Sequence, residues 1–271
     1  TKIMVIGVAD FAVEEAGWVD KIPITSWVYP EDKKPGFYDY AQAVQILPFF
    51  ISRIGPYPYQ KLSNIESTTI YGGMENANAI FYSEGSITGT SSSESLLAHE
   101  ISHQWFGDAA TETDWPHIWL SEGFATYMTN LYLEEKYGRD SLNSILKNDR
   151  QSIIHYSQRN ITAVVDSTKA GNLNRLLNIN SYQKGGWVLH MLRRKVGDSL
   201  FWKSLQTYYT RFSGSNASTS DLQNVFEETT SQDLEVFFRQ WLFTPGQPDL
   251  QINWKYSSSG NKLILKIGQK Q

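Results

Sequence analysis

The chain has 271 residues, no cysteine and a formal net charge of −4. Without cysteine it has no disulfides or thiolate metal ligands, and a mildly acidic balance with no basic stripe argues against a nucleic-acid partner. With 41% hydrophobic and 14% aromatic residues it can bury a sizeable core. Its longest apolar stretch, residues 41–54, is interrupted by Gln42, Gln45 and Pro48, so we expect a soluble chain with no membrane span. We find no targeting segment in the sequence, so the compartment stays open.

The N-terminal residues have the pattern of strands followed by a connector. Residues 3–8 and 24–29 are rich in strand-forming residues, and residues 30–36 (PEDKKPG) are charged and contain two prolines. So few strands cannot bury a core alone. We therefore expect this segment to belong to a larger β unit.

A Gly-Gly-Met-Glu-Asn segment at residues 72–76 lies between two predicted strands, residues 63–70 and 78–82. Taken alone, such a segment is a turn that carries one acidic residue. Gly72 and Gly73 lack side chains, so another backbone can approach closely and pair along a strand edge. Its function depends on what the fold places beside it.

The pentapeptide His99–His103 (HEISH) is the most informative pattern in the chain. Two residues four apart lie about 40° apart around a helix, so both imidazoles can reach one metal ion. Glu100 would point to the flank of that ion, where its carboxylate can take a proton from a bound water. A capping box at residues 91–94 and a stop signal at Gly107 predict that this segment is helical.

A second helix is predicted to begin near Pro116 and to end at Gly138. Eighteen residues separate His103 from Glu122, which would lie in the first turns of this helix and face the first one. Hydrolytic zinc sites use three protein ligands and keep a fourth position for water, and two His with one Glu is a standard set. We therefore predict one Zn²⁺ ion held by His99, His103 and Glu122.

The rest of the chain is predicted to be mainly helical and to end in a hairpin. Helical periodicity indicates helices over residues 139–155, 185–196, 198–212, 220–229 and 233–243, a polar loop region over 160–180, and a hairpin over 250–267 with its turn at 257–261. A strand-rich lobe followed by helices predicts an α+β fold.

Four segments in this order resemble the M1 family of zinc aminopeptidases, the gluzincin group that includes aminopeptidase N and leukotriene A4 hydrolase. They are residues 72–76, residues 99–107 (HEISHQWFG), residues 119–125 (WLSEGFA) and residues 182–186 (YQKGG). The resemblance covers residues 35–248. It implies a thermolysin-like zinc peptidase catalytic domain with a small mixed-sheet lobe and a mainly helical lobe.

The resemblance also implies roles for individual residues in the hydrolysis of an N-terminal peptide bond. Glu100 would be the general base, and Tyr182 would donate a hydrogen bond to the oxyanion of the tetrahedral intermediate. Glu75 would hold the free α-ammonium group of the peptide substrate, which favours an aminopeptidase over an endopeptidase. The remaining substrate-binding positions would be Gly72, Gly73, Met74 and Asn76.

Flanking β fragments are expected at both ends of this catalytic domain. M1 proteins carry a β-saddle domain before it and a β-sandwich or helical domain after it. Residues 1–34 would then be the end of an N-terminal β domain, residues 35–248 the catalytic domain, and residues 249–271 the start of a β-sandwich. We expect full activity to need the missing flanking domains of the same full-length protein.

Other functions stay open at this point. A gluzincin endopeptidase would cleave peptides with a blocked amine, and Glu75 argues against it. Epoxide hydrolysis lacks support, because the aspartate associated with it in leukotriene A4 hydrolase is not evident in residues 171–179. A non-catalytic domain would not need the full set of ligands and Glu100. The groups that orient the two histidines are equally open, with Asp108, Glu112 and Asp114 nearby in sequence.

Overall fold

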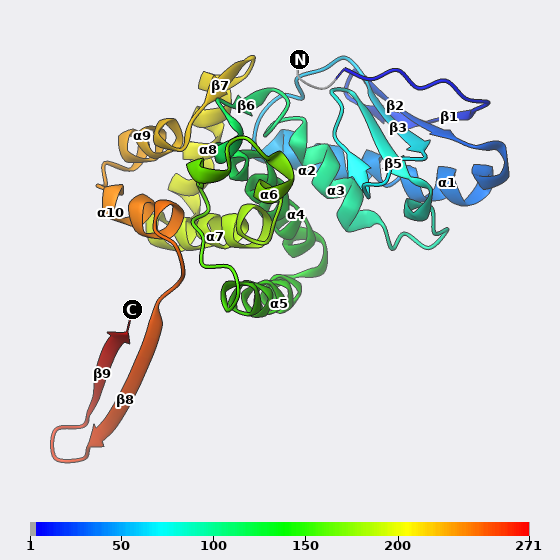
Figure 1. The fold of residues 1–271 in the computed structure, drawn as a ribbon. Coiled ribbons are helices and arrows are strands. Elements are labelled where there is room, and N and C mark those ends of the chain that lie inside the picture. The colour runs from blue at the N-terminus through cyan, green and yellow to red at the C-terminus, as the bar shows by residue number, and fades with distance from the viewer. Residues whose placement is uncertain (1–3, 271) are drawn as a thin grey trace.

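A computed structural model describes residues 4–270, in which a sheet lobe and a helical lobe lie side by side and a hairpin extends away from both (Figure 1). Two helices accompany the strands of the sheet lobe. The elements of this lobe are β1 (Ala12–Val19), β2 (Ile22–Val28), α1 (Lys33–Tyr40), α2 (Ala43–Arg53), β3 (Leu62–Ser67), β4 (Gly73–Met74) and β5 (Ala79–Ser83).

The helical lobe begins directly after the sheet lobe and continues to the hairpin. Its elements are α3 (Glu94–His103), β6 (Ala110–Glu112), α4 (Trp119–Tyr137), α5 (Arg139–Ser157), α6 (Leu173–Leu176), α7 (Gly185–Val196), α8 (Asp198–Phe212), β7 (Ser215–Ala217), α9 (Thr219–Thr230) and α10 (Glu235–Phe238). The hairpin consists of β8 (Asp249–Ser257) and β9 (Lys262–Lys270). The predicted α+β class, with a small mixed sheet and a mainly helical lobe, is confirmed.

The five-stranded sheet leaves the Gly-Gly-Met-Glu-Asn segment at an edge. Its strand order is β1-β2-β3-β5-β4, and β2, β3 and β5 run parallel to one another. Strand β4 pairs antiparallel with β5 through Gly73 opposite Tyr82 and Met74 opposite Phe81. Among the described strands β4 has β5 as its single neighbour, so its other edge is available to an extended chain.

A tight turn after α3 brings the end of that helix against the first turns of α4. Gly107 has a φ of 123°, and a Cβ atom there would lie 2.4 Å from Ser121 Oγ. The rings of Phe106 and Phe124 stack beside it with centroids 4.4 Å apart. Only glycine combines this backbone conformation with so close a contact. The predicted stop signal at Gly107 therefore also sets the distance between the two helices.

A second glycine contact brings α7 close to α4. A Cβ atom on Gly123 would lie 3.0 Å from Gly185 Cα and 3.1 Å from the carbonyl oxygen of Ser181. The π-helical turn Asn180–Lys184 precedes α7 and lies against the same part of α4. Tyr182 is thereby placed beside Glu122, which immediately precedes Gly123.

The predicted helices are present, but the capping box at residues 91–94 is wrong. Ser93 occupies the N-cap, and its hydroxyl donates to the carbonyl oxygen of Ser86 at 2.5 Å and not to the helix. The Glu94 carboxylate accepts from Tyr132 at 2.6 Å and from Lys136, both near the end of α4. Contacts with a distant helix replace the local capping contacts.

The two terminal segments differ in their contacts. Strand β2 hydrogen-bonds to β3, so the N-terminal strands continue the sheet that carries β4. The hairpin has one apolar face, whose side chains are exposed: Leu250, Ile252, Trp254, Tyr256, Leu263, Leu265 and Ile267. The domain boundaries at residues 34 and 248 stay predictions. No helix within residues 4–270 is long and apolar enough to cross a membrane.

Candidate active site

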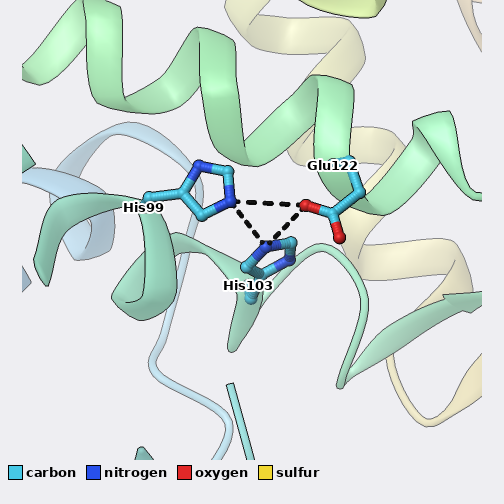
Figure 2. A group of neighbouring side chains, drawn as sticks. All are labelled: His99, His103 and Glu122. Atoms are coloured by element: carbon cyan, nitrogen blue, oxygen red, sulfur yellow. Dashed lines mark hydrogen bonds and ion pairs between the residues drawn. The ribbon is translucent and has the colours of Figure 1, made fainter. Parts of the chain in front are cut away.

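His99 and His103 from α3 and Glu122 from α4 point their polar atoms at one position (Figure 2). The two Nε2 atoms are 3.1 Å apart, and Glu122 Oε2 lies 3.3 Å from each of them. Ligands about 2.0–2.1 Å from a tetrahedral zinc ion are separated from one another by about 3.3 Å. The triangle of donor atoms therefore fits three corners of a zinc coordination tetrahedron.

The protonation of His103 suits a metal ligand. Its Nδ1 atom lies 3.1 Å from the carbonyl oxygen of Phe106 and 3.0 Å from Ser121 Oγ. A carbonyl oxygen can only accept, so Nδ1 carries a proton and Nε2 is the nitrogen directed at the triangle. His103 is thus oriented by the backbone carbonyl of Phe106 and by the hydroxyl of Ser121, the residue before Glu122. None of the three acidic residues considered from the sequence has this role for His103.

Glu122 is held in its charged form. Burial raises the pKa of its carboxyl, but the adjacent imidazoles of His103 and His99 outweigh burial and bring the pKa far below its usual range. Its side chain is 10% exposed. A carboxylate that stays ionised at a buried position is the form that can act as a metal ligand.

Glu100 lies beside the triangle in space that Gly73 leaves open. A Cβ atom on Gly73 would lie only 2.4 Å from Glu100 Oε1. The Glu100 side chain is buried, and burial raises the pKa of its carboxyl well above the usual range. Edge strand β4 thus passes directly over this carboxylate, and only a residue without a side chain fits at position 73.

Tyr182 reaches the same place from the turn before α7. Its ring lies nearly parallel to the His99 imidazole, with centroids 6.1 Å apart and an angle of 16° between the planes. Burial raises the pKa of Tyr182, and the negative charge of Glu122 raises it further. The phenol therefore keeps its proton and can donate a hydrogen bond.

Glu75 follows β4 and is partly buried at the rim of the site. Its charge contributes to raising the pKa of Glu100 and of Tyr182, so its carboxylate lies close enough to act on both groups. Its own carbonyl oxygen accepts from Gln104 Nε2 at 3.0 Å. Asn76 is buried and donates from Nδ2 to the carbonyl oxygen of Met74 at 3.2 Å, which closes the turn after β4.

Comparison with protein-family models gives a match over residues 38–241 to the Peptidase family M1 domain. The chain belongs to peptidase family M1. The family resemblance inferred from the four segments is confirmed.

Relatives of this M1 chain include plant and archaeal proteins. Aminopeptidase M1-C from Oryza sativa subsp. japonica is 32% identical over 232 residues, which are 79% of this chain and 25% of that protein. Probable aminopeptidase 1 from Sulfurisphaera tokodaii is 30% identical over 273 residues, 93% of this chain and 34% of that protein. The M1 chain therefore spans a quarter to a third of the length of these relatives.

Solved structures share the fold of this M1 chain. A crystal structure of an M1 zinc metallopeptidase from Deinococcus radiodurans superposes with a TM-score of 0.70 and 24% identity over 86% of this chain and 52% of that one. Yeast LTA4 hydrolase in complex with bestatin superposes with a TM-score of 0.80 and 19% identity over 89% of this chain and 40% of that one. At these identities the likeness supports the fold.

The M1 chain brings His99, His103, Glu122, Glu100 and Tyr182 together, with Gly73 against Glu100, and it adds residues that the sequence did not reveal. The carbonyl oxygen of Phe106, the hydroxyl of Ser121 and the amide of Gln104 hold the selected residues in place. Gly73 makes room for the Glu100 side chain, a contact that the sequence did not predict. No local pattern distinguishes these residues, because each acts through a contact made only in the folded chain.

Proposed function

We propose that this chain forms the catalytic part of a zinc aminopeptidase that removes N-terminal residues from peptides. The observation that carries the proposal is the fit of His99, His103 and Glu122 to a tetrahedral ion, with Glu100 and Glu75 on adjacent sides. A zinc ion held by His99, His103 and Glu122 would lower the pKa of a bound water and polarise the scissile carbonyl. Proton transfer, oxyanion stabilisation and amine recognition are assigned to Glu100, Tyr182 and Glu75.

Proton transfer is assigned to Glu100. Its carboxylate flanks the triangle from the side of β4, where it takes the proton of the attacking water. It then delivers that proton to the departing amine nitrogen. Tyr182, from the turn Asn180–Lys184 and beside the His99 imidazole, donates its phenol hydrogen to the oxyanion of the tetrahedral intermediate.

Exopeptidase specificity is assigned to Glu75. A peptide that lies along the open edge of β4 can pair with Gly73 and Met74 and pass Gly72 and Asn76 at close range. Its α-ammonium group then meets the Glu75 carboxylate, and a charge-assisted hydrogen bond forms. Substrates whose amine is blocked lose this contact and bring an acyl group to the same position.

Hydrolysis of aminoacyl-amides by the full-length protein tests this assignment. We expect N-acetylation to lower kcat/KM by at least about 100-fold, and Glu75→Gln to raise KM for the free amine by about tenfold or more, since a contact to a charged group is lost. A zinc chelator should abolish both activities, and added zinc should restore them.

A control variant and two contrary outcomes complete this test. Glu84→Gln removes an exposed acid of the same lobe and should leave KM unchanged. Equal rates on free and acetylated substrates would contradict the aminopeptidase assignment and favour an endopeptidase. A protein that binds zinc but hydrolyses neither substrate would contradict the catalytic assignment altogether.

Gly73→Ala is expected to lower kcat by about 100-fold, because displacement of a catalytic group by about 1 Å has effects of that size. The new methyl group would occupy the space of Glu100 Oε1 and push the carboxylate away from the water. Steady-state kinetics with metal analysis measures this, and zinc content should remain at one ion per chain.

Two glycine variants separate this explanation from simple crowding of the substrate. A Cβ atom on Gly72 meets only Leu96, at 3.5 Å, so Gly72→Ala should affect KM more than kcat. Gly85→Ala is the control for a benign substitution, since its nearest contact would be 3.9 Å away. If Gly73→Ala raised KM alone, the role of Gly73 in placing Glu100 would be wrong.

A further inference from the structure

Gln104, the residue that follows His103, lies fully buried between the metal-binding helix and the segment after β4. We propose that its side-chain amide is a positioning residue that sets the place of Glu75 relative to the zinc ligands. The proposal rests on the proposed aminopeptidase function, because it concerns how the substrate amine is recognised.

The amide of Gln104 uses its full hydrogen-bonding capacity. Nε2 donates to the carbonyl oxygen of Glu75 at 3.0 Å and to Asp108 Oδ2 at 2.8 Å. Oε1 accepts from the backbone N–H of Asn78 at 2.7 Å, and at 3.3 Å it shares the single hydroxyl proton of Tyr57 with the carbonyl oxygen of Lys61. Two N–H groups and two lone pairs are all that a glutamine amide offers. Its orientation is therefore fixed by four different partners.

Two of these partners lie on opposite sides of the turn that joins β4 to β5. The Glu75 carbonyl lies at the start of this turn and the Asn78 N–H lies at its end. Asn78 adopts a φ of 58°. Within the turn, Ala79 N donates to the carbonyl oxygen of Asn76 at 2.9 Å. The Gln104 side chain thus hydrogen-bonds to both ends of the turn that carries Glu75.

The other end of the same side chain is fixed to the metal site. Gln104 is the next residue after His103, and it forms the C-cap of α3 with its N–H bonded to the carbonyl oxygen of Ile101. The Nε2–Glu75 bond therefore joins a metal ligand to the amine-binding residue through only one intervening side chain. A catalytic site requires such neighbours to be held to about 0.5 Å.

Two substitutions of Gln104 test the proposal in the full-length protein. Gln104→Met keeps the length of the side chain and removes all four bonds. Gln104→Glu keeps the acceptor for Asn78 and Tyr57 but replaces the donor with an oxygen that faces Glu75 O and Asp108. Both should raise KM for a free-amine substrate by about tenfold while zinc content stays at one ion per chain.

The decisive readout is a double-mutant cycle with Glu75→Gln. If Gln104 acts through Glu75, its substitution in the Glu75→Gln protein should change KM by less than about twofold. A merely structural role would give the same fold-change in both backgrounds, and that result would overturn the proposal. The ratio of rates on free and N-acetylated aminoacyl-amides should fall in parallel with the rise in KM.

A matched control variant completes the design, and separate outcomes distinguish failure of the Gln104 role from failure of the proposed aminopeptidase function. Gln42 is also a buried glutamine, bonded to the Asp39 carbonyl at 2.9 Å, so Gln42→Met measures the loss of a buried amide that lies outside the proposed site. It should leave KM unchanged. If wild type does not prefer free amines, the proposed function fails. If it does and the cycle is additive, the role of Gln104 alone fails.

Discussion

Glu100→Gln is expected to lower kcat by about 10³-fold or more, because an amide cannot take the proton of the attacking water. Zinc binding should persist, since the three ligand atoms belong to His99, His103 and Glu122. Glutamine has nearly the same shape as glutamate, so it fits the space beside Gly73 without displacing β4. Stopped assays of product release, together with metal analysis of the same sample, measure both quantities.

The control for Glu100→Gln is again Glu84→Gln, which alters an exposed acid of the sheet lobe. Thermal unfolding of the variant should show no loss of stability, because burial disfavours the charged carboxylate that the substitution removes. Turnover near the wild-type rate would show that another group takes the proton, and loss of zinc would show that Glu100 supports the metal site.

Tyr182→Phe is expected to lower kcat by about 10²–10³-fold with little change in KM, the usual effect of removing one donor to an oxyanion. The phenylalanine ring keeps its nearly parallel contact with the His99 imidazole, so the metal site should stay intact. Steady-state kinetics on an aminoacyl-amide, with zinc content as a check, measures this effect.

Tyr38→Phe provides a control, since Tyr38 is 59% exposed on α1. A transition-state role for Tyr182 also predicts that a ground-state competitive inhibitor without an oxyanion binds the variant as tightly as wild type. A rise in KM with unchanged kcat would mean that Tyr182 contributes to substrate binding and not to the chemical step.

The metal site was the part of the molecule most accessible to sequence reasoning. Two histidines four apart require only a regular helix to meet, and the helix α3 supplies it. The position of Glu122 required in addition that α4 face α3, a tertiary arrangement that the predicted ligand set called for and that the M1 resemblance supported. Tyr182 could be selected only through that resemblance, because nothing in its local sequence distinguishes it from the other tyrosines.

The supporting contacts were beyond sequence reasoning for a physical reason. The proton acceptor of His103 is the backbone carbonyl of Phe106, and backbone atoms carry no residue-type signal. Gln104 joins segments that are up to 47 positions apart in the chain. The capping box failed for a similar reason, since Glu94 prefers partners at the end of α4 to the start of its own helix.

The contact of Gly123 with Gly185 has a consequence for how this enzyme would accelerate its reaction. The two backbones meet with no side chain between them, and a Cβ atom on Gly123 would lie 3.0 Å from Gly185 Cα, so these glycines let α7 pack directly against α4. The Glu122 carboxylate and the Tyr182 phenol therefore wait in a preorganised arrangement before any peptide arrives. Little reorganisation energy is then needed when charge develops on the oxyanion.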